Sequence, residues 1–284
     1  MLALLRWISG WPLWLLHALG GLLGWLTYAA SPSYRRRLRA NAAAAGVSAA
    51  DRRASIAEAG RLVAELPRLW LRPQEQPIAD PVQWEGREVL QALLARGRGV
   101  VLLTPHLGSF EVSAQAYAQA FGREQPITVL YRPARKRLLR ELEETARARP
   151  ALATAPATLA GVRQMLRALK KGQTVGLLPD QVPPEGMGVW VPFFGQPAYT
   201  MTLAARLVQQ TGAAVGLLWT ERLPRGGGYL VHASELPEPL PDDADDATAA
   251  QVINRAMESV IRRCPRQYLW GYHRYKTPRR AEGA

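Results

Sequence analysis

From residue 99 onward, short apolar runs alternate with longer amphipathic stretches, and this alternation restricts the fold more than any other feature of the chain. The apolar runs predict strands at residues 99–104, 126–131, 173–178, 213–220 and 228–233. The amphipathic stretches predict helices at residues 111–121, 134–149, 158–171, 200–211 and 248–263. Strands that alternate with helices in this way are typical of an α/β fold, so we expect a central, mostly parallel sheet flanked by helices.

The first of these predicted strands ends just before a histidine. The apolar run 99–103 leads into Thr104-Pro105-His106, and Glu111 follows five residues after the histidine. A buried strand would deliver His106 to the carboxyl end of the sheet, where open α/β sheets bind ligands. Ser109 suits the N-cap of the next helix, which would place Glu111 in the first turn of that helix.

These two side chains are candidates for a catalytic dyad. A carboxylate that accepts the proton of one imidazole nitrogen raises the basicity of the other nitrogen, so His106 paired with Glu111 could deprotonate a hydroxyl. The alternative is a capping histidine beside a solvated glutamate.

Composition narrows the possible chemistry. The chain has 284 residues, of which 48% are hydrophobic, and this is enough for one catalytic domain plus an anchor. The single cysteine, Cys264, excludes an intrachain disulfide, and the four histidines form no His-x-x-x-His pair, so we expect neither a metal nor another cofactor. The usual motifs of serine hydrolases, P-loop NTPases and dinucleotide enzymes are absent from the sequence. A formal net charge of +13 predicts an acidic partner, which could be nucleic acid, anionic lipid or an acidic carrier protein.

The amino-terminal segment is almost wholly apolar. Residues 7–30 are interrupted only by His17, and about 20 apolar residues are enough to span a bilayer. The tryptophans at positions 7, 11, 14 and 25 fall on one side of an ideal helix, which equally suits a helix lying in the headgroup region. A cleaved signal peptide is the alternative, but the arginines at 35–39 favour keeping that flank in the cytoplasm. We expect residues 1–30 to anchor a cytoplasmic catalytic domain, residues 31–284, to the membrane.

The region after the anchor is strongly basic. Residues 50–71 predict a helix that begins near Asp51 and ends before Pro73. Nine arginines but only three acidic residues lie between positions 31 and 72. Such a surface is either a solvated helix face or a face that meets lipid headgroups or a carrier protein.

Further polar and aromatic segments occur where predicted strands end. Tyr131-Arg132-Pro133 closes strand 126–131, and Pro179-Asp180-Gln181 closes strand 173–178. The apolar segment 189–195, Val-Trp-Val-Pro-Phe-Phe-Gly, follows as a predicted loop. Taken singly, such an arginine is more often a surface ion pair, such an aspartate a turn cap, and such phenylalanines part of a core.

Together and in this order, these motifs resemble those of a known family. With the apolar amino terminus and the late segment Gln-Tyr-Leu-Trp-x-x-His-Arg-Tyr-Lys at 267–276, the chain resembles the lysophospholipid acyltransferase superfamily, and within it the late, lauroyl- or myristoyl-transferring lipid A biosynthesis acyltransferases of bacteria. The likeness covers residues 1–278. It implies a glycerol-3-phosphate acyltransferase-like fold at the bacterial inner membrane, acyl carrier protein as the acyl donor, a lipid A precursor as the acceptor, and no nucleic-acid partner.

The resemblance also implies roles for individual residues. His106 and Glu111 would be the dyad of a His-x4-Glu motif, and Arg132 would contact an acceptor phosphate or the transition state. The residues implied to form the pocket are Asp180, Gln181, Phe193, Phe194 and Gly195, and those implied in the late motif are Gln267, Tyr268, Trp270, His273, Arg274 and Lys276. The family often has an acidic residue before Gln-Tyr, whereas this chain has Arg266, so the role of that edge is open.

The residues suit this chemistry without the resemblance as well. Moving an acyl group from a thioester to a hydroxyl requires a base and donors for the tetrahedral oxyanion, but no metal. His106 could be the base, and either Arg132 or backbone N–H groups near Ser109 could be the donors. Phe193, Phe194 and Trp190 suit an apolar slot for the acyl chain.

Two other functions fit parts of the sequence. One is acylation of a lysophospholipid or another lyso-lipid by the same dyad. The other is a non-catalytic, basic, membrane-tethered binding protein, which would give no reason for His106, Glu111 and Arg132 to lie at strand ends.

Overall fold

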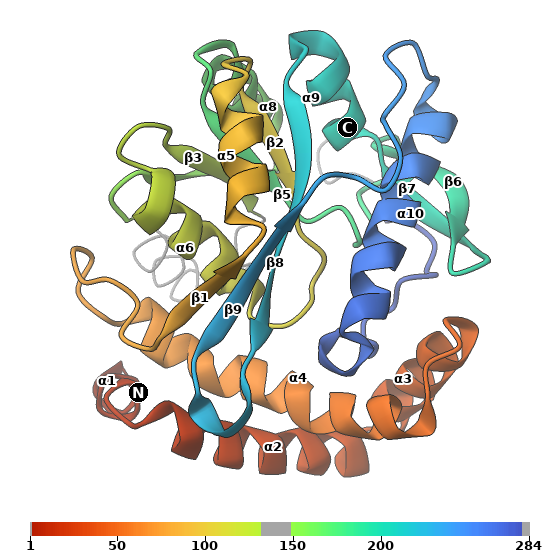
Figure 1. Ribbon diagram of the computed structural model, residues 1–284. Coiled ribbons are helices and arrows are strands. Elements are labelled where there is room, and N and C mark those ends of the chain that lie inside the picture. The colour runs from red at the N-terminus through yellow and green to blue at the C-terminus, as the bar shows by residue number, and fades with distance from the viewer. Residues whose placement is uncertain (1, 132–148, 280–284) are drawn as a thin grey trace.

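The computed structural model describes residues 2–131 and 149–279, and within them a seven-stranded sheet forms the centre of the molecule (Figure 1). The strand order is β1-β9-β8-β2-β5-β3-β4. The strands are β1 (Val82–Glu85), β2 (Val100–Leu103), β3 (Ile127–Tyr131), β4 (Leu152–Pro156), β5 (Thr174–Leu177), β8 (Ala214–Arg222) and β9 (Tyr229–Ser234). The strands from β8 to β4 in this order are mutually parallel, and of the pairs in this described sheet only β8–β9 is antiparallel. The predicted mostly parallel sheet is therefore confirmed.

Helices pack on both faces of this sheet. The helices α5 (Arg87–Ala95) and α6 (Phe110–Phe121) cover one face, and α8 (Leu159–Lys170), α9 (Leu203–Thr211) and α10 (Asp246–Arg263) cover the other. In β2, Val100 and Leu102 join the core beneath α5 and α6, whereas Val101 and Leu103 join the core beneath α8 to α10. Because successive strand side chains point to opposite faces, a strand buried on both sides is a continuous apolar run.

The predicted loop 189–195 is wrong, because this segment belongs to a hairpin. Strands β6 (Gly188–Phe193) and β7 (Gln196–Met201) pair antiparallel in a separate two-stranded sheet. The two turn residues, Phe194 and Gly195, have φ angles of 46° and 71°, and positive φ at both central residues is the requirement of a tight type I′ hairpin turn. Both strands lie at a sheet edge, which explains why the prolines at 192 and 197 are tolerated. Strand β7 also takes the first residues of the predicted helix 200–211, so α9 begins at Leu203.

The other predicted strands and helices that lie within the described residues agree with the structure to within a few residues, but β1, β4, α3 and α5 were not predicted. Arg132 and almost all of the predicted helix 134–149 lie outside the described residues.

The amino-terminal region forms a helical layer along one end of the sheet. The predicted single apolar helix is broken at residues 10–12 into α1 (Leu2–Ser9) and α2 (Leu13–Ala30), and α3 (Pro32–Ala44) and α4 (Ala49–Trp70) follow. Figure 1 shows α2 and α4 side by side at the bottom of the molecule. The two helices touch backbone to backbone, because a Cβ atom added at Gly60 of α4 would collide with Gly20 and Gly24 of α2. Helix α2 is thus part of the folded domain.

The side of α2 that faces away from α4 is apolar and exposed. Its large exposed side chains, with those of α1, include Trp7, Trp14, Leu22, Leu23, Trp25 and Leu26, each between 39% and 63% exposed. Three of the four tryptophans predicted to form a stripe are among them, and Trp11 packs edge-on against Trp7. Within the part of the chain that the structure describes, α2 is the one helix long and apolar enough to cross a membrane.

Candidate active site

His106 lies at the carboxyl end of β2, in the loop that leads into α6, and its ring is held by Asp180 at the end of the neighbouring strand β5. The Nδ1 atom of His106 lies 2.7 Å from Oδ1 of Asp180, and the backbone N–H of His106 donates to Oδ2 at 2.9 Å. The side chain of Asp180 is 1% exposed, whereas that of His106 is 17% exposed. Among the described residues, Nε2 of His106 has no hydrogen-bond partner. The arrangement therefore fixes one ring nitrogen and leaves the other open to a substrate.

The surroundings of Asp180 favour its charged form. Burial alone would raise the pKa of this carboxyl, but the charge and hydrogen bonds of His106 and the charge of Arg274 lower the pKa below its ordinary value. The hydroxyl of Tyr268 also donates to Oδ2, at 3.1 Å. Asp180 is therefore an ionised, fully satisfied acceptor, which is the state required to orient an imidazole and to stabilise its protonated form.

The segment that begins at residue 267 is hydrogen-bonded to the loop that carries His106. The N–H of Gly108 donates to the carbonyl of Gln267, and the N–H of Leu269 donates to the carbonyl of His106. Leu107 forms an isolated antiparallel bridge with Tyr268. At Gly108, φ is 58° and an added Cβ would collide with the carbonyl of Thr220, so only glycine fits there. The loop is thus fixed on both sides by residues remote in sequence.

The predicted pairing of His106 with Glu111 is not among the hydrogen bonds of the described residues. Glu111 lies in the first turn of α6 as predicted, and its Oε2 accepts a hydrogen bond of 3.3 Å from the indole of Trp70. The helix directs this side chain toward α4, while strand pairing brings the carboxylate of Asp180 to the ring. Ser109 occupies the N-cap position, but its hydroxyl donates to Glu65 and does not cap the helix.

The other predicted pocket residues lie in different surroundings. Phe193 and Phe194 are buried in the core, where Phe194 packs against Trp270, and the cavity beside Phe193 is about 10 Å³, which is room for one water molecule. Gly195 forms the hairpin turn, Trp190 is 51% exposed, and Gln181 is half-buried beside Asp180.

Arg274 is buried and supports the site. Its guanidinium donates to the carbonyl of Tyr199 and to the hydroxyl of Thr200, both at 2.7 Å, and lies over the ring of Phe193. Of the remaining late residues, the indole of Trp270 donates to the carbonyl of Pro265, His273 is exposed, and Lys276 lies over the ring of Tyr272.

Two backbone donors near Ser109 are already used. The N–H of Gly108 donates to Gln267, and the N–H of Ser109 donates to the carbonyl of Thr220 at 2.9 Å. The N–H groups in the first turn of α6 and Arg132 stay the predicted sources of a donor for the oxyanion.

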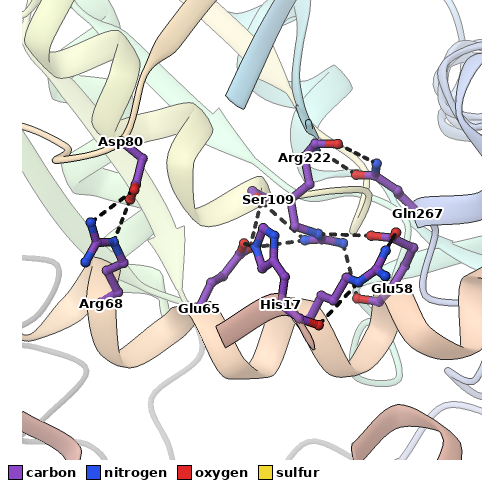
Figure 2. A network of polar contacts seen from close by, with 9 residues as sticks. His17, Glu58, Glu65, Arg68, Asp80, Ser109, Arg222 and Gln267 are labelled. Carbon is purple, nitrogen blue, oxygen red and sulfur yellow. Dashed lines mark hydrogen bonds and ion pairs between the residues drawn. The ribbon is translucent and has the colours of Figure 1, made fainter. Parts of the chain in front are cut away.

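A second polar cluster, which the sequence did not predict, links the site to the helical layer (Figure 2). Arg222, at the end of β8, pairs with Glu58 at 3.2 Å and with Glu65 at 3.1 Å, and it also donates to the hydroxyl of Ser109. Glu65 is also paired with His17 of α2 at 3.1 Å. The cluster joins α2 and α4 to Ser109, the N-cap residue of the helix that follows the His106 loop.

Comparisons with known proteins agree with the resemblance noted in the sequence. A family model described as bacterial lipid A biosynthesis acyltransferase matches residues 1–277. The chain is 31% identical to a lipid A biosynthesis lauroyltransferase of Escherichia coli (strain K12), over 75% of this chain and 67% of that protein. It is 28% identical to a lipid A biosynthesis palmitoleoyltransferase of the same organism, over 81% of this chain and 74% of that protein. A lipid A biosynthesis myristoyltransferase from that organism is 25% identical, over 83% and 72%.

Proposed function

The chain belongs to the bacterial lipid A biosynthesis acyltransferase family, and from this premise we propose that it moves a fatty acyl group from acyl carrier protein to a hydroxyl of a lipid A precursor, with His106 as the base. Family membership makes the chain an acyltransferase that acts on lipid A. The donor, the catalytic residues and the membrane location are the parts that we propose. The observation that carries the mechanism is the hydrogen bond in which Asp180 accepts from Nδ1 of His106, with Nε2 left open.

The mechanism follows from that geometry. Nε2 of His106 takes the proton of the acceptor hydroxyl while the hydroxyl oxygen attacks the thioester carbonyl carbon. The tetrahedral intermediate then collapses, the carbon–sulfur bond breaks, and the leaving thiolate receives the proton from the imidazolium. Asp180 stabilises the imidazolium between these two steps, and Tyr268 orients Asp180. We propose that Arg132 holds the oxyanion.

Glu111 stays a candidate catalytic residue. The contacts of His106 favour Asp180 as the partner of Nδ1, so in this mechanism Glu111 does not hold the ring. A direct comparison of variants at Asp180 and Glu111 decides between the two carboxylates.

The proposed donor rests on charge. A chain with a net charge of +13 attracts an acidic carrier protein, and attraction between surface charges is screened over about 8 to 10 Å at physiological salt. Turnover with acyl carrier protein should therefore fall with added salt more steeply than turnover with acyl coenzyme A. Equal salt responses, or a preference for acyl coenzyme A, would contradict the proposal that acyl carrier protein is the donor.

The proposed membrane contact is the exposed apolar side of α1 and α2. Helix α2 is joined along its length to α4, which carries charged residues, so the pair is better suited to lie in the headgroup region of the inner membrane than to cross it. The arginines of α3, at positions 35, 36, 37 and 39, lie beside this layer and suit an anionic cytoplasmic surface. We propose that residues 31–284 stay on the cytoplasmic side.

The experiment that tests the function is acyl transfer by the purified full-length protein in detergent. Acyl carrier protein loaded with lauroyl, myristoyl or palmitoleoyl groups is offered with a lipid A precursor or a lysophospholipid, and products are identified by mass spectrometry. We expect an ester on the lipid A precursor and none on the lysophospholipid. Transfer to the lysophospholipid alone, or to neither acceptor, would overturn the proposal.

A further inference from the structure

A cavity of about 540 Å³ lies between the start of α2, the middle of α4 and the turn η1 (Pro224–Gly226) that joins β8 to β9. Small-molecule sites usually have volumes of about 300–1,000 Å³. The floor is polar and buried, formed by Arg222 and Gln267, and the rim carries Trp14, Arg61, Arg225 and Arg266. We call this the η1 cavity. It is distinct from the open side of His106, because no atom of His106 or Asp180 lines it.

The ion pairs around the η1 cavity leave positive charge uncompensated. Figure 2 shows its floor, where Arg222 is paired with both Glu58 and Glu65. On the rim, Arg61 pairs with Glu58, and Arg266 pairs with Glu221 at 3.1 Å. These arginines and carboxylates balance one another in charge, and the guanidinium of Arg225 is additional to them. Arg225 forms no ion pair with any described residue.

The backbone holds Arg225 in a conformation that arginine rarely adopts. Its φ is 58°, in the left-handed region, although three glycines follow at positions 226–228. A non-glycine residue in this region carries strain, and such residues gather at ligand clamps and active sites. The turn is also fixed in place, because a Cβ added at Gly226 would collide with the backbone of Trp14. The chain therefore keeps an unpaired guanidinium at the mouth of the cavity at a conformational cost.

The same mouth adjoins the apolar outer side of α2. Trp14, which lines the cavity, is 57% exposed and lies at one end of the row of exposed leucines and tryptophans. A guanidinium presents a fork of N–H donors that matches phosphate oxygens, and apolar helix surface matches hydrocarbon chains. A ligand that satisfies both surfaces has a phosphate headgroup and acyl chains.

We propose that the η1 cavity binds the phosphate headgroup of a lipid, with Arg225 as its principal contact and Arg266 and Arg61 beside it. Two lipids carry this chemistry at the membrane, namely the phosphorylated acceptor and a membrane phospholipid. Binding of the phosphorylated acceptor rests on the proposed function. Binding of a lipid phosphate in the cavity does not depend on that function.

Binding is tested with full-length protein in neutral detergent micelles that contain phosphatidate as the probe, measured by native mass spectrometry. Arg225→Ala should weaken phosphatidate binding by about 10- to 100-fold, the range for loss of a charged hydrogen bond. Arg167→Ala, at an exposed arginine near the end of α8, is the matched control and should bind as the parent does. Arg225→Lys should recover part of the binding, and all variants should keep the parent's melting temperature.

Three results would overturn the proposal. They are unchanged binding by Arg225→Ala, an equal loss in Arg167→Ala, and inorganic phosphate binding as tightly as phosphatidate.

A kinetic experiment shows whether the bound lipid is the phosphorylated acceptor or a membrane phospholipid. If the acceptor is bound, Arg225→Ala raises KM about tenfold for the phosphorylated acceptor and leaves KM unchanged for the dephosphorylated one. If a membrane phospholipid is bound, phosphatidate binding is lost and both KM values stay the same. A parent protein without transferase activity would contradict the proposed function, while the phosphatidate result would still decide the cavity.

Discussion

Two histidines of this protein are paired with buried carboxylates, and their surroundings differ in exposure and in counter-charge. His106 is held by Asp180 at 2.7 Å, and His17 is held by Glu65 at 3.1 Å. The side chain of His106 is 17% exposed and that of His17 is 7% exposed, while both carboxylates are buried. The same pair of groups therefore occurs once with a nitrogen open to a substrate and once inside a helix contact.

The partners of the two carboxylates explain this difference. Glu65 has a buried arginine, Arg222, as a counter-charge in addition to its contact with His17. Asp180 has no arginine within ion-pair distance among the described residues, and its partners are His106 and the hydroxyl of Tyr268. In the proposed mechanism this carboxylate stabilises the imidazolium that forms when His106 takes up a proton.

The largest effect is expected at His106. His106→Gln should lower turnover by about 10²- to 10⁴-fold, the usual range for loss of general-base catalysis. The melting temperature should stay close to that of the parent protein, because glutamine keeps a polar group beside Asp180. Turnover and thermal unfolding are measured on the same preparation. Near-parent turnover in folded protein would remove His106 from the mechanism.

A substitution in the cluster around Arg222 should lower stability and leave turnover nearly unchanged. Glu65→Gln leaves the buried guanidinium of Arg222 with one counter-charge fewer, and breaking a buried ion pair costs about 3–5 kcal/mol. The free energy of unfolding, measured with denaturant in detergent, should fall by that amount. Turnover per folded molecule should stay within about tenfold of the parent value. If Glu65→Gln keeps the stability of the parent but loses turnover, Glu65 acts in catalysis and its assignment to stability is wrong.

Tyr268 offers a finer test of how Asp180 is held. Tyr268→Phe removes the hydrogen bond to Oδ2 of Asp180 and should lower turnover by about tenfold, since hydrogen bonds to charged groups contribute about 1.5–3 kcal/mol. Tyr275→Phe is the matched control, because it removes a hydroxyl that donates to the carbonyl of Phe193. Equal losses in the two variants would show a general packing effect.

The smallest expected effect concerns stability in acid. The pKa of Asp180 is lowered in the folded protein, so its contribution to stability is complete above the unfolded value of about 3.9 and is lost as the pH falls through the folded value. The free energy of unfolding should therefore fall less steeply in Asp180→Asn than in the parent below about pH 4. The difference in slope corresponds to at most about one proton. Identical slopes would show that folding does not lower the pKa of Asp180.

The sequence placed His106, Glu111 and Asp180 among the candidate site residues but did not predict that Asp180 contacts His106. His106 and Asp180 could both be placed at strand ends, because the short runs of β2 and β5 are each followed within two residues by a proline. Their contact depends on β2 and β5 being neighbours, and strand order is set by pairings between segments 74 residues apart. Glu111 was the carboxylate nearest in sequence, and sequence distance does not show the direction in which a helix turns its side chains.

Sequence patterns did not predict the buried cluster around Arg222, because it also depends on contacts between segments remote in sequence. Glu58 and Glu65 lie on a helix rich in arginine, where a periodic pattern assigns charged residues to solvent. They are buried between α2 on one side and Arg222 and Ser109 on the other, and the close approach of α2 depends on glycines in both helices. The signal that could have indicated this contact is the set of glycines at 20, 21, 24 and 60.

In the proposed mechanism Asp180, and not Glu111, holds the ring of His106 during turnover. The most direct test compares turnover of Asp180→Asn and Glu111→Gln across the pH range, with folding checked for each variant. We predict that Asp180→Asn loses about 10²-fold or more, because an amide does not stabilise the imidazolium, and that the pH at half-maximal turnover moves downward. Glu111→Gln should leave that pH unchanged. If Glu111→Gln moves the profile and Asp180→Asn does not, Glu111 holds the histidine during turnover and the proposed mechanism is wrong.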